Sequence, residues 1–266
     1  MKNRLTQKLQ EAKKKKQKLF CAYLTLGFPN LSTTEALIPA LERAGTDIIE
    51  LGFPFSDPLA DGPTIQFASE QAIKHGVQLK NAFHMIKKLR QKGLKIPVLF
   101  FTYLNPIMHY GVSRAVRQLK QSGFDGLIVP DLPPEEGRMW EPWFKRSDLS
   151  IVYLIAPTTG SDRIREIAKR SKGFIYYVSL RGVTGARDSV PPDLAQKLKE
   201  IKRVTEKLVL VGFGVSHKKQ ARAIARVADG IIVGSAIVER LANGRKTVKP
   251  VVSYVSGLIR SLKQDS

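Results

Sequence analysis

The chain has 266 residues, 43% of them hydrophobic, and its 44 Lys and Arg against 23 Asp and Glu give a net charge of +21. That length can bury a large core. No apolar run of about 18 residues exists, which excludes a membrane-spanning helix. The lysine-rich start lacks the apolar stretch of a secretory signal, so we expect a cytoplasmic protein. The single cysteine, Cys21, excludes a disulfide framework and a multi-thiolate metal site, and is expected to be an inert core residue.

The strongly basic balance first suggests a polyanion such as nucleic acid as partner. Apart from the run at 13–18, however, the cations fall in amphipathic segments such as 87–90 and 197–203, where they alternate with apolar positions. This distribution is typical of solvated outer helix faces. We therefore do not expect nucleic acid as a partner despite the charge.

Apolar runs alternate with amphipathic stretches along the whole chain, which predicts repeated βα units. After a helix in the basic first 18 residues, eight strands are predicted at 20–26, 47–52, 97–102, 126–129, 150–155, 174–178, 208–211 and 230–233. Helices are predicted at 33–44, 64–75, 79–92, 112–121, 135–146, 162–170, 192–203 and 217–225, with a short one at 235–241 and another after it. Eight such units favour a single (β/α)8 TIM barrel domain over residues 1–266. A doubly wound open sheet is the alternative.

The second predicted strand and the loop that follows it hold three carboxyl groups. Side chains alternate along a strand, so if Ile49 and Leu51 point outward, Glu50 points into the barrel. A buried carboxylate is costly unless the site uses it, so Glu50 is a candidate acid or base. Asp61 could be a helix cap before Pro63 or a second catalytic group, while Asp57 fits a plain turn.

Three glycine-rich turns follow the last three predicted strands, at 182–187, 212–216 and 234–238. Glycine lets backbone N–H groups approach an anion, and a helix N-terminus adds partial positive charge. The loops after strands seven and eight form the recurring phosphate site of TIM barrels. The three turns together therefore predict a phosphate site, with Ser235 at the start of its helix.

Other chemistries fit the residues less well. A Schiff-base aldolase needs a lysine at a strand's C-terminal end, whereas Lys95, Lys172 and Lys207 precede strands. The four histidines are scattered, which does not favour a metal, and no nucleotide-binding glycine motif occurs. We therefore expect acid–base chemistry on a small phosphorylated molecule, without metal or cofactor. Aromatic residues at strand ends could line its apolar pocket or simply fill the core; these are Tyr23, Phe101, Tyr103, Tyr176 and Phe213.

Seven motifs, in order along nearly the whole chain, closely resemble the signature of the tryptophan synthase α subunit family. They are Glu50-Leu-Gly-Phe-Pro-Phe-Ser-Asp-Pro-Leu-Ala-Asp-Gly-Pro-Thr-Ile-Gln66, Leu26-Gly-Phe-Pro29, Tyr103-Leu-Asn-Pro106, Pro130-Asp-Leu-Pro133, Gly182-Val-Thr-Gly-Ala186, Gly212-Phe-Gly214 and Gly234-Ser-Ala-Ile-Val238.

The resemblance implies a TIM barrel that cleaves indole-3-glycerol phosphate to indole and D-glyceraldehyde 3-phosphate, without metal or Schiff base. Glu50 would protonate indole C3 and help to deprotonate the glycerol hydroxyl, and Asp61 would stabilise positive charge at the indole nitrogen. The expected phosphate ligands are Gly185, Gly214, Gly234 and Ser235. Phe213 would form a wall, and Thr184 would begin a segment that closes over the substrate.

The resemblance also implies an αββα complex in which indole passes to a pyridoxal-phosphate β subunit. Pro54, Asp57 and Pro58 match positions in the partner-facing or mobile loop. Arg181 stands where many members have a small or hydroxyl residue, and the charge of +21 is more basic than the family pattern.

Two alternative functions are another phosphate-binding barrel enzyme and a polyanion-binding protein.

Overall fold

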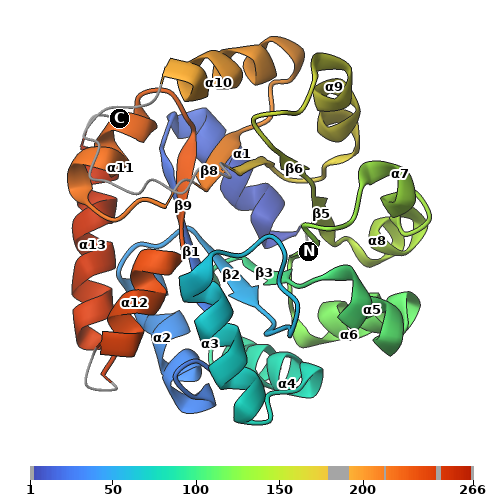
Figure 1. Ribbon diagram of the computed structural model, residues 1–266, viewed down its shortest axis with the longest axis vertical. Helices are drawn as coiled ribbons and strands as arrows, with labels where there is room; N and C mark the ends of the chain where they lie inside the picture. Colours follow the sequence, from blue (N-terminus) through green and yellow to red (C-terminus); the bar gives the residue numbers. More distant parts are fainter. Residues whose placement is uncertain (1–2, 179–191, 213, 244–246, 265–266) are drawn as a thin grey trace.

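The computed structural model describes residues 3–178, 192–212, 214–243 and 247–264, and it forms a barrel of parallel strands inside a ring of helices (Figure 1). All strand pairs are parallel, in the order β5-β4-β3-β2-β1-β9-β8-β7-β6. The strands are β1 (Leu19–Thr25), β2 (Ile48–Gly52), β3 (Val98–Phe101), β4 (Gly126–Ile128), β5 (Ser150–Val152), β6 (Leu154–Ile155), β7 (Ile175–Val178), β8 (Val209–Gly212) and β9 (Gly230–Val233).

The two ends of this sheet are halves of one predicted strand, and that is how the barrel closes. β5 pairs with β4 and β6 pairs with β7, and only Tyr153 separates β5 from β6. The Tyr153 N–H donates to the Ser171 hydroxyl, 3.0 Å away, which interrupts the regular pairing. The prediction of a (β/α)8 barrel is therefore confirmed, although the strand predicted at 150–155 is divided in two.

The helices surround the strands. They are α1 (Arg4–Lys15), α2 (Leu31–Arg43), α3 (Pro63–Lys74), α4 (Leu79–Gln91), α5 (Leu104–Tyr110), α6 (Val112–Ser122), α7 (Pro134–Gly137), α8 (Glu141–Ser147), α9 (Ser161–Arg170), α10 (Pro192–Val204), α11 (Lys218–Ala225), α12 (Ser235–Asn243) and α13 (Lys249–Lys263).

Two helix predictions were incomplete. α5 was not predicted. It is a short helix that ends at Tyr110, and Gly111, whose φ of 90° suits glycine, separates it from α6. The helix predicted at 135–146 is divided into α7 and α8. Pro142 lies in the first turn of α8, where its missing N–H costs nothing, so a new helix can begin there.

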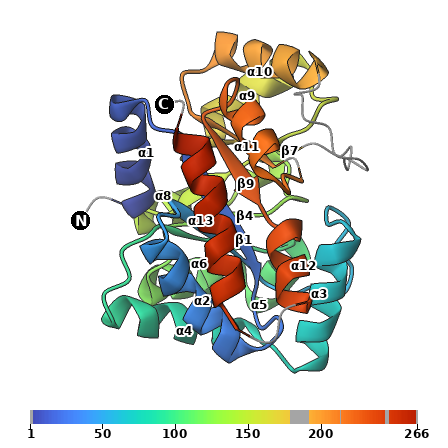
Figure 2. The same ribbon diagram turned by 90° about the vertical axis from the view of Figure 1, so that its left-hand side faces the viewer.

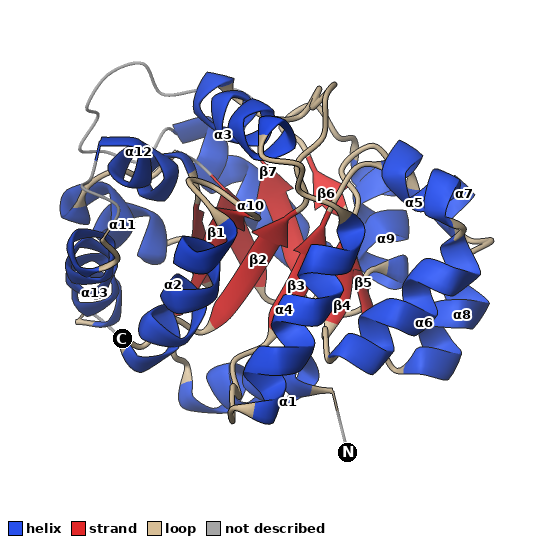
Figure 3. Cartoon of the chain, turned by 90° about the horizontal axis from the view of Figure 1, so that it is seen from below, coloured by secondary structure: helices blue, strands red, loops and turns tan. Residues whose placement is uncertain are grey.

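α1 covers the N-terminal end of the barrel. Leu5, Leu9 and Ala12 are its buried face. The amide of Asn3, which caps the helix, donates to the carbonyl oxygens of Asp125 and Asp148, which lie just before β4 and β5. Figures 2 and 3 show α1 on the side of the molecule opposite α3 and α12. The C-terminal ends of the strands are thus left for the loops that carry the candidate site.

Within the described ranges, we find no helix long and apolar enough to cross a membrane.

The buried carboxylate of Asp125 connects several elements at the N-terminal end of the barrel. It accepts hydrogen bonds from Arg90 Nη2 at 2.7 Å, Arg4 Nη1 at 3.0 Å and the Val98 N–H at 2.9 Å. Arg90 also donates to the carbonyl oxygens of Gly123, Leu94 and Ile96. This cluster joins α1, α4 and the starts of β3 and β4.

We expect Asp125→Ala to lower the free energy of unfolding by about 3–5 kcal/mol, because it leaves the Arg90 guanidinium buried without its carboxylate. Urea denaturation measures the loss. The matched control is Asp162→Ala, which removes an exposed partner of Arg165 and should cost no more than about 0.5 kcal/mol. Equal losses in the two variants would show that the cluster contributes no more than a surface ion pair.

Candidate active site

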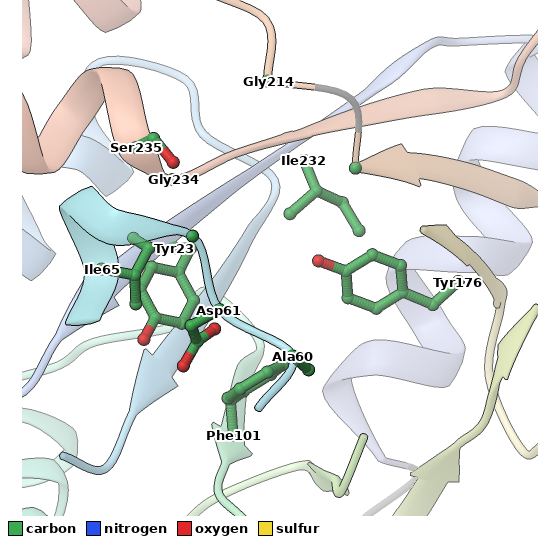
Figure 4. A pocket seen from close by; sticks show the side chains of 12 residues that line it. Tyr23, Ala60, Asp61, Ile65, Phe101, Tyr176, Gly214, Ile232, Gly234 and Ser235 are labelled. Carbon is green, nitrogen blue, oxygen red and sulfur yellow. The ribbon is translucent and has the colours of Figure 1, made fainter. Parts of the chain in front are cut away.

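A cavity of about 140 Å³ lies at the C-terminal end of the barrel, where the strand ends converge (Figure 4). Its lining comes from five strands, the loop after β2, and the starts of α3 and α12. The lining residues are Tyr23, Ala60, Asp61, Gly62, Ile65, Phe101, Tyr176, Gly212, Gly214, Ile232, Gly234 and Ser235. Of the predicted pocket aromatics, Tyr23, Phe101 and Tyr176 therefore line this cavity.

Glycines make room for the aromatic walls. A Cβ on Gly212 would lie 2.8 Å from the Tyr176 ring, and one on Gly52 would lie 2.2 Å from the Tyr23 hydroxyl oxygen. Tyr23 also meets Phe101 edge-on, with ring centroids 5.5 Å apart. Gly212 was predicted only as part of an anion-binding turn, but its observed contact is with the Tyr176 ring.

The predicted phosphate ligands that the structure describes lie together at one side of the cavity. Gly214 has a φ of 61°, a left-handed conformation that glycine adopts easily. α12 begins at Ser235, and the Gly234 carbonyl accepts its first helical hydrogen bonds. The amides of this first turn lack intrahelical acceptors and carry the positive end of the helix dipole, which suits an anion.

Four sequence-predicted positions lie outside the described residues: Thr184, Gly185, Phe213 and Arg181.

Glu50 is completely buried in the barrel, as its predicted inward direction requires. It pairs in register with Tyr23 on β1 and Leu99 on β3. Its side chain is not part of the cavity lining, but its partner in register on β1, Tyr23, is. Burial raises the pKa of Glu50 itself to about 8, although a hydrogen bond from Cys21 opposes the increase. Glu50 is therefore an uncharged acid at neutral pH.

Asp61 lies at the cavity, and it does not cap α3. The residue at the cap position is Gly62, followed by Pro63 in the first turn. Burial raises the pKa of Asp61 to about 6, while a hydrogen bond from the Tyr103 hydroxyl lowers it in part. The cap reading left open by the sequence is thus excluded. The carboxyl group is available to a ligand and largely ionised at neutral pH.

Tyr103 holds the loop that carries Asp61. Its hydroxyl oxygen accepts the Ala60 N–H at 3.0 Å, and its ring stacks on Phe55 with centroids 5.3 Å apart. It was predicted as a pocket residue, but it is not among the residues that line the cavity. A tyrosine two residues beyond the end of β3 gave no sequence signal for this hydrogen bond.

The three residues predicted for partner contact differ in exposure. Asp57 is exposed, Pro58 is half-buried and Pro54 is buried. Asp57 therefore presents its carboxylate to solvent, whereas Pro54 stiffens the loop from within.

Among the described residues, no group of three or more His, Cys, Asp or Glu side chains is arranged to hold a metal ion.

Comparison with known proteins matches the tryptophan synthase alpha chain family model to residues 9–265. The tryptophan synthase alpha chain of Geotalea daltonii is 44% identical over 247 residues, which are 92% of this chain and 93% of that relative. Among solved structures, tryptophan synthase subunit alpha from Legionella pneumophila superposes with a TM-score of 0.91 at 32% identity, covering 99% of this chain and 100% of that one. Tryptophan synthase from Mycobacterium tuberculosis gives 0.90 at 33% identity, with 99% of each chain covered.

The raised pKa of Glu50 makes stability depend on pH. Between its ordinary pKa of 4.5 and its folded-state pKa of about 8, the unfolded chain has lost the proton that the folded chain keeps. Rising pH therefore favours unfolding in this window. We expect the free energy of unfolding to fall by about 2–4 kcal/mol relative to that of Glu50→Gln from about pH 5 to about pH 8.5.

Urea denaturation of both proteins across this range measures the difference. The control is Glu70→Gln, at an exposed carboxylate paired with Lys74. The difference in free energy of unfolding between this variant and the unaltered chain should not change with pH across this range. A flat difference for Glu50→Gln as well would mean that Glu50 is ionised in the folded protein.

Proposed function

Because the chain belongs to the tryptophan synthase alpha chain family, we propose that Glu50 and Asp61 are its two catalytic carboxyl groups. The activity of this family is the cleavage of indole-3-glycerol phosphate to indole and glyceraldehyde 3-phosphate, a lyase reaction of tryptophan biosynthesis. The observation that carries the proposal is a buried glutamic acid, uncharged at neutral pH, on the strand next to Tyr23, which lines a cavity that also contains the carboxylate of Asp61.

Glu50 would act first as an acid. Its raised pKa leaves a proton on the carboxyl group at neutral pH, and that proton goes to C3 of the indole ring. The ring then carries a positive charge at its nitrogen. Asp61, which is largely ionised at neutral pH, would stabilise that charge from the cavity wall.

Glu50 would then act as a base. Its carboxylate takes the proton of the glycerol hydroxyl next to the ring, the oxygen becomes a carbonyl, and the bond to indole C3 breaks. The bonding electrons return to the ring and neutralise it. Indole and the aldehyde glyceraldehyde 3-phosphate are released, and Glu50 regains the proton with which the next cycle begins.

The substrate would bind with its phosphate at Gly214, Gly234 and Ser235 and its indole ring between Tyr23, Phe101 and Tyr176. The amide groups at the start of α12 complement a dianion. The three aromatic rings supply apolar surface to the same cavity. The cavity thus offers complementary surface to both parts of the substrate. Gly185, Thr184 and Phe213 complete the proposed site from the sequence pattern alone.

Substitution of the two acids should separate chemistry from binding. We expect Glu50→Gln to reduce indole release at least about 100-fold, because the amide cannot donate or accept the proton. Asp61→Asn should reduce it about 10- to 100-fold by removing the opposing charge. Indole is measured by absorbance or colour reaction with and without a β subunit.

Binding of glyceraldehyde 3-phosphate supplies the control, since both variants should bind it within about twofold of the unaltered chain. Substantial turnover by Glu50→Gln would refute the assigned role.

Members of this family work with a β subunit, and we infer that the loops after β2, β3 and β4 form its docking surface. The Ala60 N–H donates to Tyr103, and the Leu104 N–H donates to both carboxylate oxygens of Asp131, which links the three loops. Leu59 and Met108 in this region are 82% and 56% exposed. Exposed apolar side chains beside the cavity are suited to a permanent partner. An αββα tetramer in the cytoplasm is the assembly we propose.

The docking surface can be tested by adding polar groups to it. We expect Leu59→Ser and Met108→Ser each to raise the Kd for a tryptophan synthase β subunit about 10-fold, measured by titration calorimetry, since each buries less apolar area. Met139→Ser is the matched control, at a side chain that is 74% exposed between α7 and α8 and outside these three loops, and should change Kd less than about twofold. If Met139→Ser weakens binding as strongly as Leu59→Ser, the contact surface extends over α7 and α8 instead.

A further inference from the structure

The cysteine at position 21 contacts the proposed catalytic acid. Its Sγ lies 3.6 Å from Glu50 Oε1, and both side chains have no exposed surface. On the barrel wall Cys21 is in register with Ile48, two residues before Glu50 on β2. The thiol therefore meets the carboxyl group from the N-terminal side, on the face of Glu50 turned away from the cavity.

In this contact the thiol is the donor. Burial, with the charge of Glu50 as the next cause, raises the pKa of Cys21 well above its ordinary value, so the sulfur keeps its proton. The S–H group can then donate to Oε1, which is an acceptor whether or not the carboxyl group is ionised. Glu50 Oε2 is buried and has no hydrogen-bond partner within the described ranges. The two carboxyl oxygens are therefore not equivalent.

We propose that Cys21 is a positioning residue for Glu50. The Cys21 thiol binds Oε1 of Glu50 and leaves Oε2 to exchange a proton with the substrate. The inference rests on the proposed catalytic role of Glu50. It also gives Cys21 an influence on when Glu50 ionises. A hydrogen bond to the charged form of a carboxyl group favours that form. The thiol therefore opposes the effect of burial and keeps the pKa of Glu50 closer to neutral.

The other titrating groups around Glu50 do not obscure this effect. Tyr23 on β1 and Tyr176 on β7 have pKa values raised well above the ordinary value, first by burial, so both stay protonated. Asp61 titrates near 6, below Glu50. Asp47 lies near the base of β2, where its charge acts on Cys21. Ionisation near pH 8 in the free enzyme is thus assigned to Glu50.

The first experiment measures the pH dependence of kcat/KM for indole release in variants of Cys21. Activity should fall as Glu50 ionises, and the midpoint of that alkaline limb reports its pKa. We expect Cys21→Val and Cys21→Ala to move this midpoint upward by roughly 0.5 to 1 pH unit, because both remove the hydrogen-bond donor. In Cys21→Ser, which keeps a donor, the midpoint should stay within about 0.3 pH unit of that of the unaltered chain.

If Cys21 acts only by filling space, the midpoints of the variants should rank differently. Valine would then behave like cysteine because it fills the same space, and serine would behave like alanine because both leave a gap. That result would overturn the proposal. The four proteins therefore separate hydrogen bonding from volume even if one variant is unstable.

The second experiment observes the contact directly. The chain has one cysteine, so the infrared S–H stretching band belongs to Cys21 alone. We expect the band to move to lower frequency as pH rises through about 8, since a carboxylate is a stronger acceptor than a carboxylic acid. In Glu50→Gln the band should not change with pH. A band that is independent of pH in the unaltered chain would overturn the proposal.

These outcomes remain distinct from a failure of the proposed function. If Glu50→Gln still releases indole, the catalytic role of Glu50 is wrong whatever the S–H band shows. If Glu50→Gln is inactive but the S–H band does not respond to pH, the role of Glu50 stands and that of Cys21 is wrong.

Discussion

The burial of one carboxyl group inside a closed barrel is the constraint on which the site depends. Glu50 has no exposed surface, and the strands on both sides of β2 pair with it along its length. Ionisation in such a place is costly, so the protein keeps the proton at neutral pH and its pKa is raised to about 8. A carboxyl group that keeps its proton at neutral pH can transfer that proton to a carbon atom of the substrate. The cost of burial and the capacity for acid catalysis have the same physical origin.

The rest of the C-terminal end holds groups of opposite character at fixed positions around this acid. Asp61 is ionised over most of the neutral range, and the Tyr103 hydroxyl fixes the loop that carries it. The start of α12 offers amide groups to the same cavity. Between these ends, glycines let the rings of Tyr23 and Tyr176 lie directly against the barrel wall. The cavity therefore combines a carboxylate, aromatic rings and the amide groups of a helix start, next to the buried acid.

The sequence predicted most of this arrangement because the relevant signals are local. Strand alternation was enough to predict that Glu50 is buried in the barrel, and the glycine-rich turns after the last two strands lie at the cavity, as their position in the chain predicts. What it could not predict were contacts between segments distant in the chain. The bond from Ala60 to Tyr103 and the contact of Cys21 with Glu50 depend on barrel register, and the interruption at Tyr153 depends on Ser171. Cys21 was expected to be inert because a lone cysteine in an apolar run reveals nothing of its neighbour.

Infrared difference spectroscopy between the unaltered chain and Glu50→Gln measures whether Glu50 keeps its proton in the resting enzyme. We expect a protonated carboxyl C=O band at about pH 6.5 that is absent from the variant and is replaced by carboxylate bands above about pH 8. If the difference spectrum shows only carboxylate bands at about pH 6.5, Glu50 is not the acid of the reaction, because an acid ionised there could not supply the proton.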